Sequence, residues 1–291
     1  MLNLDKPAGL TSAAAVGRVR RSSGEKRVGH GGTLDPSATG VLPIFFGRAT
    51  VLAEYLSAQG KEYAAHVVLG AASSTDDAEG EISAVPVPPG VDAPTVSAAL
   101  SSFVGEVDQA PPAYSAVKIG GERSYRLARR GDEPQPAARR VRLDAATLTG
   151  LSVDGDGSLV AAIKIECGPG FYVRSLARDL GASLGTRGHL RSLRRTRVGP
   201  LQASESIELE AAEALGADLA PQLQPAALAA SALIEVLVLP SDEGRLAHGM
   251  EVAAPVVGDG PAFARAEDGR LLAIGDLAAG RFHPRRLVEL A

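Results

Sequence analysis

"GHGGTLDPSATGVLPIFFG", residues 29–47, joins a loop of small residues to an apolar run and carries a single acidic residue, Asp35. The apolar part, residues 41–47, predicts a buried strand. The glycines before it either form turns or build a backbone nest for an anion, and an aspartate in front of a proline is typical of a turn or a helix cap. The stretch therefore predicts a loop followed by a strand and leaves the role of the carboxylate open.

The segments on either side predict both helices and strands. A helix capped by Thr11 or Ser12 is expected before the stretch, and a helix capped by Thr50 is expected after it. Alternation over residues 61–70 predicts a strand that places Tyr63 with the apolar face, which alone is typical of a core residue.

The second half of the chain continues this mixture. Residues 95–107 have apolar side chains at helical spacing, and residues 141–167 predict strands joined by a turn at residues 154–157. A helix follows with Arg174 in its first turn, where the helix dipole disfavours a cation unless a carboxylate lies near it. Arg174 is therefore either an exposed surface residue or the partner of an acid.

The last part of the chain predicts a separate domain. An Ala/Pro/Leu-rich connector covers residues 220–230, and short strands with polar turns follow it. We therefore expect a boundary near Ala232 and a compact β-barrel over residues 233–291 that packs on the main body, residues 1–232.

Composition excludes several classes of protein. With 291 residues, 45% of them hydrophobic, the chain is expected to bury one large core with or without a small satellite domain. No apolar run is long enough to cross a membrane, and no export signal is expected. The single cysteine, Cys167, argues against a disulfide framework and suits a reducing cytosol. No P-loop, HExxH, GxSxG or dinucleotide-binding motif occurs, so common metal and cofactor enzymes are not expected.

Positive charge is concentrated in two runs, although the formal net charge is −4. The first run contains Lys118, Arg123, Arg126, Arg129, Arg130, Arg139, Arg140 and Arg142, and the second contains Arg187, Arg191, Arg194, Arg195 and Arg197. Such runs indicate either a solvated helix face or a surface for nucleic acid.

Six segments, which follow one another along the chain, favour a nucleic-acid surface over a solvated helix face. They are "NLDKPAGLTS", "GHGGTLDPSATGVLPI", "KEYAAHVVLG", "TDDAEG", "PPAYSAVKIGGERSYRLARRG" and "CGPGFYVRSLARDLG". Together they resemble the bacterial tRNA pseudouridine-55 synthases over roughly residues 2–200. The C-terminal segment, through "GDLAAGRFHPRRLVE", is similar to the PUA-like RNA-binding domain of that family.

The resemblance implies a fold and a reaction. The fold would be α+β, with a mixed, mostly antiparallel sheet flanked by helices and a small C-terminal β-rich, PUA-like domain. The reaction would flip a T-loop uridine out of its stack, cut it from its ribose and rejoin it through carbon. Asp35 would be the nucleophile, Arg174 its cationic partner and Tyr63 the ring that stacks on the uracil. His30 would contact the loop from which the base leaves.

The resemblance also implies how RNA is held. Residues 119–139 match an insertion that grips the T-arm of tRNA. The residues expected to bind substrate are Lys6, His30, Arg123, Arg126, Arg129, Arg130, Leu176, Arg187 and Arg191. No cofactor, metal or protein partner is expected, and we expect a cytoplasmic monomer.

Two alternatives remain beside this interpretation. An RNA-binding chaperone that folds tRNA would need the basic runs without catalysis. Phosphoryl transfer through an aspartyl-phosphate is disfavoured because Ser37 stands where a second acid is usual. The chain also departs from the family at Gly31, where a threonine is frequent, and at Ser73 and Ser74, where a Thr-Asp pair is frequent. Glycine at the first position is expected to loosen the loop.

Overall fold

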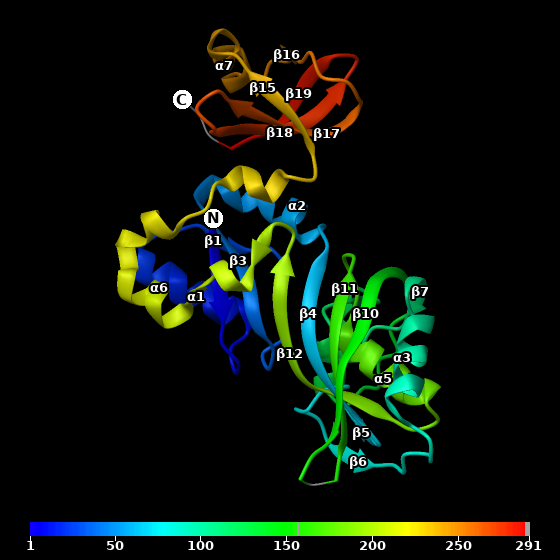
Figure 1. The fold of residues 1–291 in the computed structure, drawn as a ribbon. Helices are drawn as coiled ribbons and strands as arrows, with labels where there is room; N and C mark the ends of the chain where they lie inside the picture. Colours follow the sequence, from blue (N-terminus) through cyan, green and yellow to red (C-terminus); the bar gives the residue numbers. More distant parts are fainter. Residues whose placement is uncertain (156, 289–291) are drawn as a thin grey trace. The chain divides into compact units, whose positions relative to one another are not determined.

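Strands provide the frame of the computed structural model, which describes residues 1–155 and 157–288 (Figure 1). The model divides into two compact units. The first unit contains residues 1–36, 40–59 and 197–291, and the second contains residues 37–39 and 60–196. Residue 156 of the expected turn and residues 289–291 lie outside the described residues.

The first unit is built on the strand that sequence predicts after the Asp35 loop. This strand, β3 (Thr39–Phe46), pairs antiparallel with β1 (Leu2–Lys6) and with β2 (Val28–His30). A short strand, β14 (Ile207–Glu208), runs parallel to β1. The result is a mixed, mostly antiparallel arrangement.

Helix α1 (Ser12–Ser23) connects β1 with β2. Its N-cap is Thr11, whose hydroxyl accepts a hydrogen bond from the backbone of Ala14, so one of the two predicted caps is confirmed. The helix packs on α6 (Leu209–Leu215), and the guanidinium of Arg18 forms an ion pair with Glu213 of that helix.

The helix expected after β3 differs from the prediction. It consists of a 3₁₀ segment, η1 (Gly47–Leu52), followed by a short α-helix, α2 (Ala53–Ser57). Thr50 is not a cap, because it lies inside η1 and its hydroxyl donates to the carbonyl of Gly47. A 3₁₀ turn is common at the start of a helix, and it consumes the residues that the pattern assigned to the first α-turn.

The second unit contains long antiparallel strands. The order β4 (Lys61–Leu69), β11 (Leu159–Cys167), β10 (Arg139–Val153) and β7 (Gly105–Gln109) follows the pairing along the sheet. Strand β12 (Gly188–Val198) lies beyond β4. Helix α3 (Ala93–Ser102), which Asp92 caps, contacts β10, and helix α5 (Val173–Ser183) contacts β4 (Figure 1).

The remaining elements are short. They are β5 (Ala71–Ser73), β6 (Ile82–Ala84), β8 (Lys118–Ile119), β9 (Glu122–Arg123), α4 (Ser124–Arg129), β13 (Leu201–Gln202), η2 (Ala203–Glu205), η3 (Gly216–Gln222) and η4 (Ala226–Ala230).

The C-terminal part folds as a five-stranded sheet with its own core. Its strands, in spatial order, are β15 (Ile234–Val238), β17 (Gly260–Ala266), β18 (Leu271–Ala278), β19 (Arg281–Leu287) and β16 (Val252–Ala253). Helix α7 (Pro240–Ala247) contributes Leu246 to a core that also contains Val236 and Phe282. The α+β fold with a β-rich C-terminal part is therefore confirmed, while the boundary near Ala232 stays a prediction.

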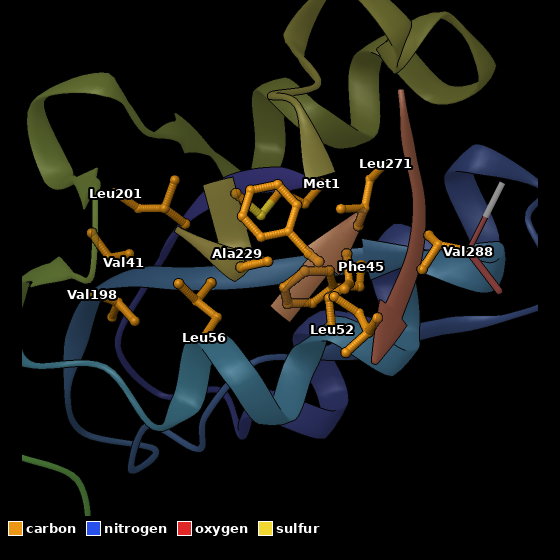
Figure 2. Packing of buried hydrophobic residues seen from close by; sticks show 13 residues of the cluster. Met1, Val41, Phe45, Leu52, Leu56, Val198, Leu201, Ala229, Leu271 and Val288 are labelled. Carbon is orange, nitrogen blue, oxygen red and sulfur yellow. The ribbon is translucent and has the colours of Figure 1, made fainter. Parts of the chain in front are cut away.

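A second core joins this sheet to the rest of the first unit. Leu271 of the C-terminal sheet belongs to the same buried cluster as Phe45 and Leu52 (Figure 2). Phe263 of that sheet is a further member of the cluster. The predicted connector enters the cluster as well, because Ala229 and its neighbour in η4 are fully buried.

Burial of a lysine gives the second unit a pH-dependent stability. Lys61 is 9% exposed, and desolvation, with a smaller effect of Arg195, lowers the pKa of its ammonium from 10.5 to about 8. Between these two values the unfolded chain binds a proton that the folded chain does not bind. The free energy of unfolding is therefore expected to rise across this pH range, by about 2–3 kcal/mol relative to pH 8.

The measurement is chemical denaturation between pH 7.5 and 10.5. Lys61→Met should remove the increase, and Lys26→Met, at an exposed position, should retain it. If the free energy of unfolding changed with pH in the same way for the wild type and Lys61→Met, burial would not destabilise the ammonium.

Candidate active site

Asp35 is held in place through the residues on each side of it. Before it, the hydroxyl of Ser12 accepts a hydrogen bond from the backbone N–H of Leu34 (2.8 Å) and donates one to the carbonyl of the same residue (2.9 Å). Ser12 is 2% exposed and Leu34 is buried, so these bonds are shielded from water. Asp35 itself is half-buried.

After Asp35, the chain is fixed by Lys6. The carbonyl of Pro36 accepts a hydrogen bond from Lys6 Nζ (3.1 Å) and one from the backbone N–H of Gly9 (2.8 Å). The same ammonium donates to the carbonyls of Pro7 and Leu10, at 2.8 Å each. An ammonium has three donors, and here each has a backbone carbonyl. Substrate binding by Lys6 stays a prediction, while these contacts give it a positioning role.

His30 and Gly31 begin the loop. His30 is half-buried at the end of β2 and faces Ile44 of β3 in the register. A Cβ added at Gly31 would lie 2.8 Å from Cε2 of Phe45, which is fully buried. Glycine thus allows the loop to approach the core, and its N–H donates to the carbonyl of Pro43. The glycine was expected to loosen the loop, but this packing and hydrogen bond hold the loop at Gly31.

Gly31→Ala is therefore expected to destabilise the protein by about 1–3 kcal/mol through overpacking. The reason is that the Phe45 ring cannot withdraw from the added methyl group without disturbing the core. Thermal unfolding of the variant measures the effect, with Gly244→Ala in the exposed part of α7, where a Cβ meets nothing within 4 Å, as control. A variant as stable as the wild type would contradict the expectation.

Tyr63 and Leu176 lie in the second unit. Tyr63 is 7% exposed on β4, opposite Ile165 of β11, so the predicted apolar orientation is confirmed. Leu176 is buried in α5 with Val173, as part of the apolar side of the helix. Their contacts with substrate stay predictions.

Arg174 occupies the first turn of α5 as predicted, and it has a carboxylate partner in the second unit. Its guanidinium lies 3.4 Å from the carboxylate of Asp77 and donates to the carbonyls of Thr75 (3.2 Å) and Tyr114 (2.9 Å). The side chains of Arg174 and Asp77 are only 6% and 8% exposed, so the ion pair is shielded. Asp35 belongs to the first unit, and its expected pairing with Arg174 stays a prediction.

Sequence reasoning did not single out Asp77 or its neighbour Asp76. Asp76 forms an ion pair of 3.0 Å with Arg178, one turn after Arg174. Burial raises the pKa of Asp76, and Arg178 opposes that rise. The sequence does contain a signal, because two consecutive acids and two arginines four residues apart on a helix can form two ion pairs. Only the fold shows that these residues lie close together.

The basic insertion presents its arginines to solvent. The exposed side chains are those of Arg123 on β9, Arg126 and Arg129 on α4, and Arg130 directly after α4. The Arg129 guanidinium lies 5.8 Å from the centre of the Tyr125 ring. Arg130 forms an ion pair with Glu122 (2.9 Å). Arg187 and Arg191 are exposed in and before β12, and Arg191 forms an ion pair with Asp154. Contacts between these arginines and RNA stay predictions.

Within residues 1–155 and 157–288, no helix is long and apolar enough to cross a membrane. In that same part of the chain, no group of three or more His, Cys, Asp or Glu side chains could hold a metal ion.

The comparisons with known proteins give first the class, enzymes that convert uridine to pseudouridine, and then the family. Residues 20–173 match the N-terminal domain model of the TruB family pseudouridylate synthases, and residues 174–243 match the tRNA pseudouridylate synthase B C-terminal domain. The chain belongs to the TruB family.

Two relatives agree with this assignment. tRNA pseudouridine synthase B of Thermobifida fusca is 43% identical over 97% of this chain and 95% of its own length. The enzyme of the same name from Ruegeria sp. TM1040 is 40% identical over 98% and 94%.

Two solved structures share the fold. A chain of an H/ACA RNP bound to a substrate RNA containing 2′-deoxyuridine has a TM-score of 0.75 at 22% identity, over 99% of this chain and 84% of that one. A chain of a Cbf5-Nop10-Gar1 complex has a TM-score of 0.73 at 24% identity, over 99% of this chain and 84% of that one.

Proposed function

We propose that this protein converts a uridine in the T-loop of tRNA, at position 55, to pseudouridine. The match to proteins named tRNA pseudouridine synthase B, at about 40% identity over nearly the whole chain, carries the proposal. The held Asp35 loop provides the reactive group that the reaction needs.

The reaction is an isomerisation. The bond between N1 of uracil and C1′ of ribose breaks, the base turns, and a bond forms between C5 and C1′. The proton on C5 leaves for solvent and the freed N1 takes up a proton, so the product has the composition of the substrate. No oxidant, reductant or second substrate enters, which agrees with the expectation that no cofactor is required.

Asp35 acts as the nucleophile in this scheme. A carboxylate that adds to the nucleoside forms a covalent intermediate and divides one difficult step into two easier ones. Arg174 serves as the cationic partner of this carboxylate, and its guanidinium is itself held by the ion pair with Asp77.

The base reaches Asp35 only after it leaves its stack. Tyr63 offers a ring for the flipped uracil, and His30, at the start of the same loop as Asp35, lies against the RNA loop that the base has left.

RNA is gripped by two regions in this proposal. The catalytic domain spans residues 1–232, with the arginines of the insertion at 119–139 on T-arm phosphates, and residues 233–291 form a PUA-like RNA-binding domain. Phosphate contacts give affinity, and recognition of the uridine comes from the shape of the T-loop. A single, buried cysteine, Cys167, suits the cytoplasm, where we place the enzyme.

The test is tritium release from a T-arm hairpin whose uridines are labelled at C5. The purified chain, without added metal, cofactor or partner protein, should release one tritium per RNA. A hairpin with cytidine at position 55 should release none. Binding of the hairpin without release would replace this proposal with the RNA-binding chaperone.

A further inference from the structure

Helix α5 holds two separate segments of the second unit with one side of its first two turns. Arg174, Ser175 and Arg178 all point their polar groups at these segments. The first segment contains Asp76 and Asp77, and the second is residues 110–114, here called the strap.

The strap is bound to the helix at both of its ends. The carbonyl of Ala110 accepts hydrogen bonds from Ser175 Oγ (2.8 Å) and from the Arg178 guanidinium (3.0 Å). The carbonyl of Tyr114 accepts one from Arg174 (2.9 Å). Just before the strap, the Gln109 amide donates to the carbonyl of Tyr172 (3.1 Å) and accepts from its N–H (2.8 Å).

The strap leads directly into the basic insertion. The hydroxyl of Ser124, at the first residue of α4, donates to the carbonyl of Ala113 (2.5 Å). The backbone N–H of Tyr125 donates to the carbonyl of Ser115 (3.0 Å). The helix that bears Arg126 and Arg129 is therefore hydrogen-bonded to the same segment whose carbonyl holds Arg174.

The segment with Asp76 turns at that residue. Asp76 has φ of 60°, a left-handed conformation that aspartate adopts more readily than most residues other than glycine. This backbone turn allows Asp76 to meet Arg178 while Asp77 meets Arg174. Arg178 contacts both segments, through Asp76 and through Ala110, as Arg174 does through Asp77 and Tyr114.

We propose that Arg178 is a positioning residue for Arg174. It fixes the two segments whose backbone carbonyls, at Thr75 and Tyr114, orient the Arg174 guanidinium. When the Arg178 side chain is removed, the first segment loses its ion pair to α5 and the strap loses one hydrogen bond to α5. The carbonyls that hold Arg174 then move. The inference rests on the proposed function, in which Arg174 acts on Asp35.

The test compares Arg178→Ala, Arg178→Lys and Val160→Ala with the wild type. Val160 is buried in β11 and packs in the apolar cluster with Val68 and Ala71, so its truncation controls for lost stability alone. Three quantities are measured: the single-turnover rate of tritium release at saturating enzyme, the Kd for the T-arm hairpin, and hydrogen exchange of the amides at residues 115–125.

Arg178→Ala is expected to slow the single-turnover rate by about tenfold or more, because small misplacement of a catalytic group has large effects on rate. Its Kd should stay within about twofold of the wild type, since no phosphate contact is assigned to Arg178. The amide of Tyr125 should exchange faster. Arg178→Lys keeps a cation near Asp76 and should recover part of the rate.

Three outcomes overturn the inference: a wild-type rate for Arg178→Ala, an equal slowing by Val160→Ala, or an unchanged exchange rate at Tyr125. If the wild type releases no tritium, the proposed function fails and the catalytic meaning of the inference fails with it. The exchange measurement then still decides whether Arg178 holds the strap.

Discussion

Asp35→Asn is expected to abolish pseudouridine formation and to leave RNA binding intact. The amide has nearly the size and shape of the carboxylate but is not a nucleophile, so the covalent step is lost. The expected decrease in single-turnover tritium release is roughly 10⁴-fold or more, the scale seen when an enzyme loses its nucleophile. Binding of the same hairpin at fixed salt should change by less than about twofold, because Asp35 makes no phosphate contact in the proposed scheme.

The matched control is Asp218→Asn, which makes the same chemical change at an exposed position on η3. It should release tritium at the wild-type rate. If Asp35→Asn remained active, the carboxylate would not be the nucleophile. If neither the wild type nor Asp35→Asn released tritium while both bound RNA, the enzyme proposal would fail.

Lys6→Met is expected to produce the second large effect, on both stability and rate. Methionine matches the apolar stem of lysine but leaves the carbonyls of Pro7, Leu10 and Pro36 without their shared donor. Lys6 is fully buried, so water does not replace it, and a loss of about 3–5 kcal/mol in the free energy of unfolding is expected. The Pro36 carbonyl is next to Asp35, so the rate should fall by about tenfold or more even where the variant remains folded.

Denaturation and single-turnover assays at a temperature where the variant is folded measure the two effects. Lys26→Met, at an exposed position, is the control for loss of one positive charge and should change neither. Ser12→Ala should give a smaller loss of the same kind, since it removes only the bonds to Leu34. A stable Lys6→Met variant with weakened RNA binding alone would instead support the substrate-binding role that the resemblance implies.

Local patterns predicted most of the elements because their causes lie within a few residues. Alternation identified β4 and placed Tyr63 on its buried face, and helical spacing placed Arg174 in the first turn of α5. The dipole argument gave an acidic partner as one of two alternatives for Arg174, and the structure shows such a partner in Asp77. What failed locally was the start of the helix after β3, where 3₁₀ and α geometries compete over the same residues.

Contacts over long sequence distances were not predictable from such patterns. Lys6 reaches Pro36 and Arg174 reaches Asp77 only after strands and helices are placed. The paired aspartates at residues 76 and 77 look like an ordinary polar turn in the sequence, because Asx residues favour turns. The need for glycine at position 31 is understood only from the structure, in which the ring of Phe45 occupies the space that a Cβ would need.

The cluster formed by Phe45, Leu52, Phe263 and Leu271 changes how a deletion experiment is to be understood. Removing residues 233–291 would uncover apolar side chains next to β3, the strand that follows the Asp35 loop, instead of releasing a detachable module. A shortened enzyme that aggregates or loses activity would then report a solvent-exposed core and give no measure of how much RNA affinity the C-terminal sheet supplies. Substitutions of surface charges on that sheet leave the packing intact and can therefore measure how much RNA affinity the sheet supplies.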